Sequence, residues 1–300
     1  MRFTAIGLLI LLGSVPAHAE SSYVTSDVTI ATTTGGVPQD IPARLLKPEG
    51  DGPFPAIVML HDCSGLGPRS SGAPGRWSAL LAGQGYVVII PDSFTPRGFP
   101  QGVCTAPFGP QTNTVNPVPR AADALATLAF LRTLPYIDGK RIGVMGGSHG
   151  GTTTLAANIF ATGQPNGFAA AIAFYPGCGG RLGEWNVDRH PAPGPVTGYI
   201  GTYRPAAPLL ILIGEKDDWT PAADCKVMAE RAQAAGYPVT IKIYPGAYHA
   251  FDNNSSPRYI AERRNINKPD GRGATTGGDA AAWADSINEV KSFFARTLAR

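Results

Sequence analysis

Ser148 has the surroundings in this chain that most clearly suggest chemistry. It lies in the pentapeptide Gly-Gly-Ser-His-Gly, Gly146–Gly150, which follows the apolar run Arg141–Met145 and precedes a helix-like stretch, Thr152–Phe160. This order predicts a strand, a sharp turn and a helix, with the hydroxyl above the sheet because glycine lets neighbouring backbone approach. We therefore predict that Ser148 is a nucleophile. A glycine-rich turn with an incidental serine is the alternative for the pattern by itself.

A serine nucleophile needs a base, and the base needs a carboxylate that fixes its tautomer. In the chain order serine, acid, histidine, each partner follows a core strand. Asp217 follows the apolar run Pro208–Gly214, and His249 follows the alternating run Val239–Tyr244. These positions predict Asp217 as the acid and His249 as the base.

Competing residues can be weighed one by one. His18 lies in a leader-like segment, and His190 has no strand-like run before it. His149 is the direct neighbour of the serine, and His61 precedes the serine in the chain. None of them fits the expected order, so His249 remains the predicted base. For the acid, the neighbours Asp218 and Glu215 leave an alternative open.

Two backbone amides are candidates for an oxyanion hole. One is the N–H of His149, the residue after the nucleophile, and the other is the N–H of Cys63, in the loop after the apolar run Ala56–Leu60. Preorganised donors of this kind typically contribute a few kcal/mol each to an acyl-transfer transition state. The expected chemistry therefore needs no metal and no cofactor.

The elements that must position these residues alternate along the chain. Strand-like segments are Tyr23–Thr33, Pro42–Lys47, Ala56–His61, Tyr86–Asp92, Arg141–Gly146, Ala169–Pro176, Pro208–Gly214 and Val239–Tyr244. Helix-like segments include Ala121–Leu134, Ala223–Ala235 and Ala281–Leu298. The later strands are continuous apolar runs, as expected for parallel strands buried on both faces. The sequence thus predicts a single α/β domain over residues 20–300, with a mostly parallel central sheet and helices on both faces.

Three long stretches interrupt this alternation. They are Phe94–Pro119, Gly177–Pro208 and Asp252–Asp279, all rich in Pro, Gly, Asn and Arg. Structureless segments of such length in a compact domain are usually lids or disorder. Because two of them directly follow strands, we expect all three to wall the pocket, with disorder of Gly271–Gly278 as the alternative.

The first 19 residues have the order of a secretory signal. Arg2 precedes the apolar core Ala5–Leu12, and the small-residue sequence Ala17–Ala19 precedes Glu20. This order predicts removal of residues 1–19 and export, either to the periplasm or out of the cell. The apolar core is much shorter than the roughly 20 residues that a membrane span needs, and no other stretch is long and apolar enough.

Charge does not suggest a nucleic-acid partner. The formal net charge of +3 would fall to +2 on loss of a leader whose one charged residue is Arg2, and only 16% of residues are charged. Because no basic patch or stripe is evident, a small-molecule substrate is the expected partner.

The four cysteines form an even set in a chain predicted to be exported, which favours disulfides. Cys63 and Cys104 follow the two strands before Ser148, whereas Cys178 and Cys225 follow two later strands that should be neighbours. We therefore expect the pairs Cys63–Cys104 and Cys178–Cys225, with free buried thiols as the alternative. No CxxC or HxxxH spacing occurs, so no metal site is expected.

These motifs together resemble the dienelactone hydrolase family of α/β hydrolases. The shared segments are His61–Leu66, Pro91–Gly98, Gly146–Gly150, Tyr175–Gly177, Gly214–Pro221 and Tyr244–Phe251. The resemblance implies an α/β-hydrolase fold, Ser148, Asp217 and His249 as the triad, and the Cys63 and His149 amides as the oxyanion hole. The enzyme that names the family carries cysteine as its nucleophile, whereas position 148 is serine here. A general ester or lactone hydrolase is therefore expected.

Arg97 is a candidate ligand for a substrate carboxylate. It follows the strand-like segment Tyr86–Asp92 by a few residues, and a guanidinium can bind a carboxylate through two parallel hydrogen bonds. The resemblance implies a carboxylate-binding arginine in this region, although the place of a second one, four residues after the histidine, is taken by Asn253. An arginine that lies on the surface or pairs with a nearby acid is the alternative.

The expected function is hydrolysis of a small ester or lactone through an acyl-Ser148 intermediate. A peptidase or acyltransferase with the same triad is an alternative, because fold and triad do not fix the substrate. A non-catalytic binding protein on a hydrolase scaffold belongs to a third class, but no triad member is missing.

Overall fold

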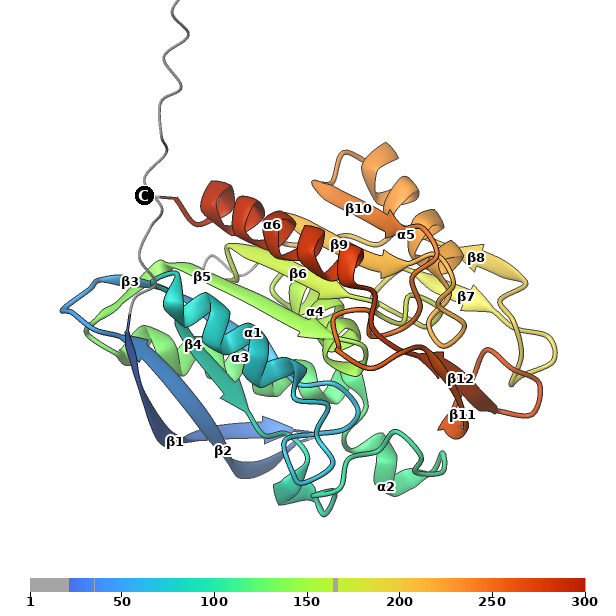
Figure 1. Ribbon diagram of the computed structural model, residues 1–300, viewed down its shortest axis with the longest axis horizontal. Helices are drawn as coiled ribbons and strands as arrows, with labels where there is room; N and C mark the ends of the chain where they lie inside the picture. Colours follow the sequence, from blue (N-terminus) through green and yellow to red (C-terminus); the bar gives the residue numbers. More distant parts are fainter. Residues whose placement is uncertain (1–21, 35, 164–166, 300) are drawn as a thin grey trace, which may run out of the picture.

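An eight-stranded sheet forms the centre of the protein (Figure 1). The computed structural model describes residues 22–34, 36–163 and 167–299, so the predicted leader at residues 1–19 lies outside the described residues. The strand order in the sheet is β1-β2-β4-β3-β5-β6-β9-β10. The bounds are β1 Tyr23–Thr34, β2 Val37–Pro48, β3 Phe54–Leu60, β4 Val87–Pro91, β5 Ile137–Gly147, β6 Ala170–Phe174, β9 Leu209–Gly214 and β10 Val239–Tyr244.

Most neighbouring strands in this sheet are parallel. β1 pairs antiparallel with β2 and β2 with β4, whereas all pairings from β4 through β3, β5, β6 and β9 to β10 are parallel. Every residue of β4, β6 and β9 is buried, which explains why these strands are continuous apolar runs in the sequence. The predicted mostly parallel sheet is confirmed.

Helices cover both faces of the sheet. α1 (Ala73–Gly83) and α6 (Ala280–Thr297) lie over one face, and α3 (Pro117–Thr133) and α4 (His149–Phe160) lie over the other (Figure 1). The rings of Trp77 and Trp283, 4.8 Å apart, join α1 to α6. α5 (Ala222–Ala234) packs against β9 and β10. Among the described residues, no helix combines the length and apolarity needed to cross a membrane.

The three stretches predicted to be irregular contain short regular elements. The first holds η1 (Thr95–Arg97) and α2 (Pro110–Asn113), and in the second β7 (Asn186–Asp188) pairs with β8 (Gly198–Ile200). In the third, β11 (Arg258–Arg264) and β12 (Arg272–Thr276) form an antiparallel hairpin. None of the three stretches is therefore structureless, and β12 lies within Gly271–Gly278, for which disorder was the alternative.

One physical reason why the third stretch forms a hairpin is a contact with a residue that directly follows a strand of the main sheet. The Asp218 carboxylate, just after β9, accepts a hydrogen bond of 2.7 Å from the N–H of Thr275 in β12. The side-chain amide of Asn265 donates to the carbonyls of Asp218 and Gly273. The contacts of Asp218 link residues far apart in the sequence, so local composition does not reveal them.

The carboxyl ends of neighbouring parallel strands meet at one edge of the sheet. Cys63 follows β3, Ser148 follows β5, Tyr175 follows β6, Asp217 follows β9 and His249 follows β10. Ligands bind at this edge in open α/β sheets. The topology therefore gathers the predicted site residues at one place.

Candidate active site

Ser148 occupies the turn between β5 and α4, with φ 53° and ψ −115°. A positive φ is uncommon for a residue with a side chain, and such strain costs about 1–3 kcal/mol that the surroundings must offset. The Ser148 N–H donates to the Phe174 carbonyl at 2.9 Å. A Cβ on Gly150 would lie 2.1 Å from the Leu60 carbonyl oxygen. Glycine at position 150 is therefore required for the turn to pack against β3.

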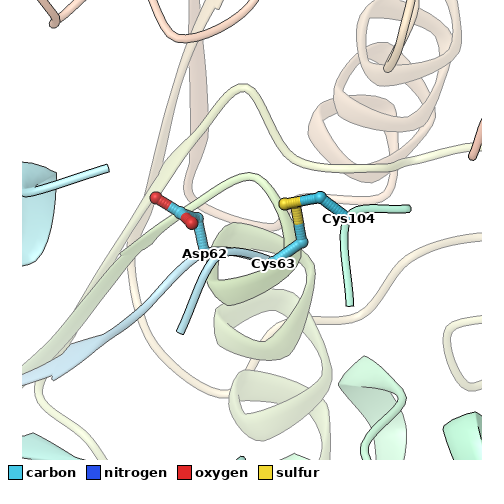
Figure 2. Close-up of side chains that lie close together, drawn as sticks. All are labelled: Asp62, Cys63 and Cys104. Carbon is cyan, nitrogen blue, oxygen red and sulfur yellow. A yellow bond between two sulfur atoms is a disulfide. The ribbon is translucent and has the colours of Figure 1, made fainter. Parts of the chain in front are cut away.

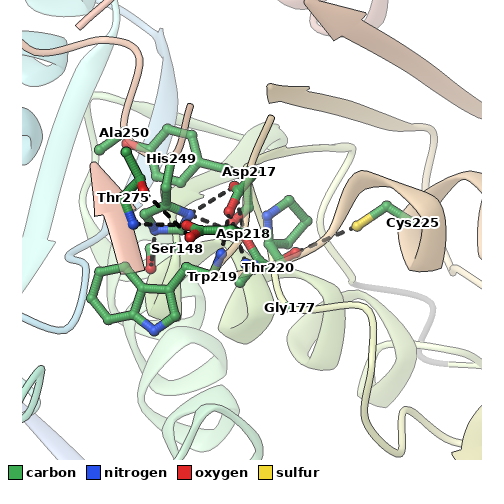
Figure 3. A network of polar contacts seen from close by, with 12 residues as sticks. Ser148, Gly177, Asp217, Asp218, Trp219, Thr220, Cys225, His249, Ala250 and Thr275 are labelled. Carbon is green, nitrogen blue, oxygen red and sulfur yellow. Dashed lines mark hydrogen bonds and ion pairs between the residues drawn. The ribbon is translucent and has the colours of Figure 1, made fainter. Parts of the chain in front are cut away.

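His249 lies between Ser148 and Asp217 (Figure 3). Its Nε2 is 2.9 Å from Ser148 Oγ, and its Nδ1 is 2.8 Å from Asp217 Oδ2. All three residues are buried, which strengthens their mutual electrostatic interactions. When Nδ1–H donates to the carboxylate, Nε2 is left to accept the hydroxyl proton. The geometry therefore suits general-base activation of a serine.

The two adjacent aspartates point to different partners (Figure 3). Asp217 Oδ1 accepts the backbone N–H groups of Trp219 and Thr220 at 2.9 and 2.8 Å, which leaves Oδ2 facing His249. Asp218 instead binds the β11–β12 hairpin through Thr275 and the ammonium group of Lys268. The structure thus brings Asp217, and not Asp218, to the histidine.

Sequence reasoning missed three residues that surround the histidine. Thr220 Oγ1 donates to Asp217 Oδ2 at 2.8 Å and lies 3.1 Å from His249 Nδ1. The rings of Tyr175 and Trp219 lie 4.7 and 4.8 Å from the imidazole. The Asp-x-x-Thr spacing is a local signal that could have indicated Thr220. The two aromatic neighbours depend on tertiary packing.

The proposed oxyanion donors line the same cavity as Ser148. Within the described ranges, the N–H of Cys63 has no hydrogen-bond acceptor, and the N–H of His149 opens α4, where the first amides lack intrahelical partners. Cys63, Ser148 and His149 together form part of one wall. The arrangement could place two amide donors beside the carbonyl of an ester bound at Ser148.

A buried arginine, Arg120, contacts both segments that carry the proposed oxyanion donors. Arg120 is 0% exposed; its Nη2 donates to the His61 carbonyl at 3.1 Å, and its Nη1 lies 2.7 Å from His149 Nδ1. Because a guanidinium has no acceptor, His149 Nδ1 must accept, which puts the ring proton on Nε2. Burial, followed by the charge of Arg120, holds the pKa of His149 well below its usual value. His149 is therefore neutral.

Ser148 opens into a cavity of about 460 Å³. All three stretches expected to wall the pocket contribute to it, through residues such as Phe108, Arg189 and Arg264. The Arg264 guanidinium lies 4.2 Å above the Phe108 ring. Its Nη1 is buried without a hydrogen-bond partner in the part of the chain that the structure describes.

Arg97 does not lie in this cavity, which corrects the prediction that it binds substrate. Its guanidinium makes two hydrogen bonds to Asp123, of 2.6 and 2.8 Å, and two more to the Ser93 carbonyl and to Thr34 Oγ1. The side chain is 6% exposed and that of Asp123 is 0% exposed. The alternative, an arginine paired with a nearby acid, describes its position.

Two disulfides join the cysteines, in the pairs expected from the sequence. They are Cys63–Cys104 and Cys178–Cys225. Figure 2 shows the first disulfide beside Asp62, whose carboxylate turns away from the sulfurs. The three groups lie within 4.8 Å of one another. Because both sulfurs are bonded to each other, they do not supply the thiolates that would bind a metal.

The sequence profile of the dienelactone hydrolase family matches residues 41–298. The chain belongs to the dienelactone hydrolase family. It has the α/β-hydrolase fold of that family, and membership makes it a hydrolase of the class that cleaves esters or lactones.

Several known proteins are similar to this member of the dienelactone hydrolase family. A Methylorubrum extorquens protein named "Putative carboxymethylenebutenolidase" is 31% identical over 255 residues, which cover 80% of this chain and 81% of that protein. A crystal structure of a "Putative Dienelactone Hydrolase" from Klebsiella pneumoniae is 20% identical, with a TM-score of 0.62 and coverage of 91% and 99%, and shows the shared fold. A Bacillus subtilis protein named "Uncharacterized peptidase YuxL" is 25% identical over 295 residues, covering 85% of this chain and 42% of that protein.

Proposed function

We propose that this dienelactone hydrolase family member cleaves a small ester or lactone through a covalent acyl-Ser148 intermediate. The observation that carries the proposal is the contact of His249 with Ser148 Oγ on one side and with Asp217 on the other. No metal or cofactor takes part in the steps below.

Acylation begins when Ser148 Oγ attacks the substrate carbonyl carbon and its proton passes to His249 Nε2. Asp217 holds the imidazole and stabilises the imidazolium that forms. The carbonyl oxygen becomes negative and accepts hydrogen bonds from the Cys63 and His149 amides. Collapse of the tetrahedral intermediate breaks the ester C–O bond, and His249 returns the proton to the departing alkoxide oxygen.

Deacylation repeats these steps with water as the nucleophile. His249 Nε2 removes a proton from water, the hydroxide adds to the acyl carbon, and the same amides hold the oxyanion. Collapse then releases the carboxylic acid and restores the Ser148 hydroxyl. With a lactone the alcohol and the acid stay in one molecule, so the product is a single hydroxy acid.

The charges on the cavity wall support a substrate with an anionic substituent. Arg181, Arg189 and Arg264 line the cavity, whereas Asp224 is its one acidic residue among those that the structure describes. Arg189 already donates to the carbonyls of Gly179 and Gly194. The half-buried Arg264 side chain lines the same cavity, and we propose that it receives a substrate carboxylate.

We also propose that residues 1–19 are a signal peptide, that residues 20–300 form one hydrolase domain, and that the enzyme works in the periplasm or outside the cell. Two disulfides support this location, because disulfides persist in oxidising compartments. The N-terminal sequence of protein purified from the exported fraction tests the proposal. It should begin at Glu20, and an intact Met1 would contradict it.

Hydrolysis of p-nitrophenyl acetate, butyrate and octanoate by the wild type and by Ser148→Ala tests the activity. The wild type should turn over the shorter esters, and the variant should not. A fluorophosphonate probe should label Ser148, as mapped by peptide mass spectrometry. Labelling at another residue, or an active Ser148→Ala protein, would overturn the serine mechanism. His190→Asn, at an exposed histidine, is the matched control and should remain fully active.

A peptidase is the second candidate, because one similar protein carries that name. The same triad can attack an amide, but the leaving amine must be protonated as it departs. Paired p-nitrophenyl ester and p-nitroanilide substrates with the same acyl group separate the two functions. Because an activated ester reacts faster than an anilide in either class of enzyme, anilide turnover decides: none above the Ser148→Ala background supports the proposal, and release of p-nitroaniline that depends on Ser148 supports the peptidase.

A further inference from the structure

Cys63 belongs to both the active-site wall and a disulfide. Its N–H is one of the proposed oxyanion donors, and its sulfur is bonded to Cys104 (Figure 2). Both cysteines line the cavity that contains Ser148. Any movement of the loop around Cys104 would therefore be transmitted by a covalent bond to the residue that carries the donor.

The surroundings of this disulfide form a small core of their own. Cys63, Phe94, Val103 and Val115 make up a buried cluster that is separate from the main core of the sheet and its helices. Four buried residues remove little apolar surface from water in comparison with the main core. The S–S bond is the covalent link across this small cluster, against which Phe99, Cys104, Ala106 and Trp219 also pack.

The backbone couples the Cys104 loop tightly to the oxyanion loop. The Val103 N–H donates to the Cys63 carbonyl at 2.7 Å, and Gly102 packs so closely that an added Cβ would lie 2.5 Å from the same oxygen. On its other side, the Cys104 carbonyl accepts the N–H of Arg264 at 3.0 Å. The disulfide thus sits between the oxyanion loop and the β11–β12 hairpin.

The second disulfide has a different setting. Cys178 and Cys225 are 1% and 0% exposed and belong to the main core, so packing holds them whether or not they are bonded. The sequence separations of the two disulfides are similar, 41 and 47 residues. Because the entropic effect of a cross-link depends only weakly on loop length, the two should stabilise the fold to a similar extent.

We infer that the Cys63–Cys104 disulfide is a positioning element of the active site, which holds the Cys63 amide where it can bind the oxyanion. The inference rests on the proposed serine mechanism. It makes full turnover dependent on the oxidised state of this one disulfide, whereas Cys178–Cys225 carries no proposed oxyanion donor. Reduction by a dithiol adds two electrons and two protons to give the thiols of Cys63 and Cys104, and the dithiol becomes a cyclic disulfide.

Two double variants test the inference: Cys63→Ala/Cys104→Ala and, as the matched control, Cys178→Ala/Cys225→Ala. Both should show a lowered melting temperature. Well below that temperature, the first variant should lose kcat by about 10- to 100-fold, less than the loss for complete removal of an oxyanion donor. The control should keep kcat within about twofold of the wild type, because no proposed donor moves.

A transition-state analogue separates positioning from general loosening. A trifluoromethyl ketone adds to the serine and places an oxyanion in the hole, so the first variant should bind it more weakly by the factor lost in kcat. The KM for p-nitrophenyl acetate should change much less. Equal kcat values and equal analogue affinities in the two double variants would overturn the inference, as would a loss confined to KM.

If Cys63→Ala/Cys104→Ala does not fold, reduction of Cys178→Ala/Cys225→Ala tests the same inference. In Cys178→Ala/Cys225→Ala the remaining disulfide is Cys63–Cys104, so dithiothreitol should lower kcat in step with thiol labelling at Cys63 and Cys104, and reoxidation should restore it. Full activity of the reduced protein would contradict the inference. Ser148→Ala, measured in parallel, keeps the two proposals apart: activity in that variant overturns the serine mechanism itself.

Discussion

The carboxyl edge of the sheet and the loop wall that faces it are built differently. Ser148, Asp217 and His249 follow strands of the eight-stranded sheet by a few residues and take their positions from the main core. The loop wall, residues 94–119 and 252–279, depends on a four-residue core, a disulfide and hydrogen bonds from residues such as Asp218.

This difference separates two tasks. The reacting groups need fixed geometry, and the ends of buried strands provide it. The loop residues that line the cavity lie on segments outside the sheet, and surface loops generally tolerate more change than the elements they connect. Changes at the edge should therefore mainly lower kcat, whereas changes in the wall should alter KM or stability, except at the Cys63–Cys104 disulfide, which holds a proposed oxyanion donor.

The largest effect is expected at the edge, for Ser148→Ala and His249→Ala. Each should lower kcat by about 10⁶-fold, because a serine triad without its nucleophile or base retains little catalysis. Steady-state kinetics with p-nitrophenyl acetate measures the loss. Thermal unfolding of Ser148→Ala should show nearly unchanged stability, whereas His249→Ala should lower it, because it removes a buried ring that contacts Asp217. A His249→Ala protein with activity close to wild type would show that another group is the base.

Asp217→Asn should follow, with a loss of about 10⁴-fold in kcat, since the amide favours the wrong histidine tautomer. Asp218→Asn is the matched comparison. It should lose far less activity, because Asp218 binds Thr275 and Lys268 rather than the imidazole. The reverse ranking in the same assay would make Asp218 the acid.

Arg97→Ala tests whether this arginine is structural. It leaves the Asp123 carboxylate, at 0% exposure, without its ionic partner, and breaking such a pair costs about 3–5 kcal/mol. Urea unfolding should show this loss, with KM unchanged for neutral and carboxylate-bearing esters alike. Arg44→Ala, which removes an exposed pair with Asp27, is the control and should cost less than about 1 kcal/mol. A selective rise in KM for the charged ester would return Arg97 to the substrate site.

Arg264→Ala, unlike Arg97→Ala, should change KM rather than the free energy of unfolding. The KM for an ester that carries a carboxylate should rise by about 10- to 150-fold, as expected for one charge-assisted hydrogen bond worth 1.5 to 3 kcal/mol. A neutral ester of the same size should be almost unaffected. Arg204→Ala, at an exposed arginine, serves as the control. Equal effects of Arg264→Ala on the KM of both esters would show that Arg264 stabilises the loops and does not bind the substrate carboxylate.

The smallest effect per residue concerns pH. Burial is the main cause that lowers the pKa of both His61 and His149 well below 6.5, so the folded protein binds no proton there while the unfolded chain does. Below about pH 6.5 the free energy of unfolding should therefore fall, by about 1.4 kcal/mol per histidine and pH unit. Urea unfolding at several pH values measures the slope.

A histidine variant isolates this contribution. His149→Asn should make the dependence of unfolding free energy on pH less steep, by the contribution of one histidine. The buried Asp252 acts in the opposite direction, because burial raises its pKa, but it is present in both proteins and cancels in the comparison. An identical slope in His149→Asn and the wild type would show that His149 is protonated in the folded state.

The features that could be read from the sequence are those with a local signal. Glycine at 146 and 150, an apolar run before Ser148 and a helix-like run after it identify the turn, because each conveys the backbone geometry at its own position. Chain order then selects Asp217 and His249. The choice between Asp217 and Asp218 needed the structure, since one backbone turn directs the two carboxylates to opposite partners.

The sequence by itself determined the eight strands of the central sheet, the sharp turn, the chain order of the candidate triad and the α/β class, because these depend on patterns within a few residues. Tertiary structure alone decided which charged side chains meet. Arg97 pairs with Asp123, 26 residues further along the chain, and Arg120 reaches His61 and His149. Such pairings depend on where elements cross in space, which neither composition nor periodicity encodes. The sequence therefore indicated the residues proposed for the chemistry, and the fold decided which arginine faces the cavity.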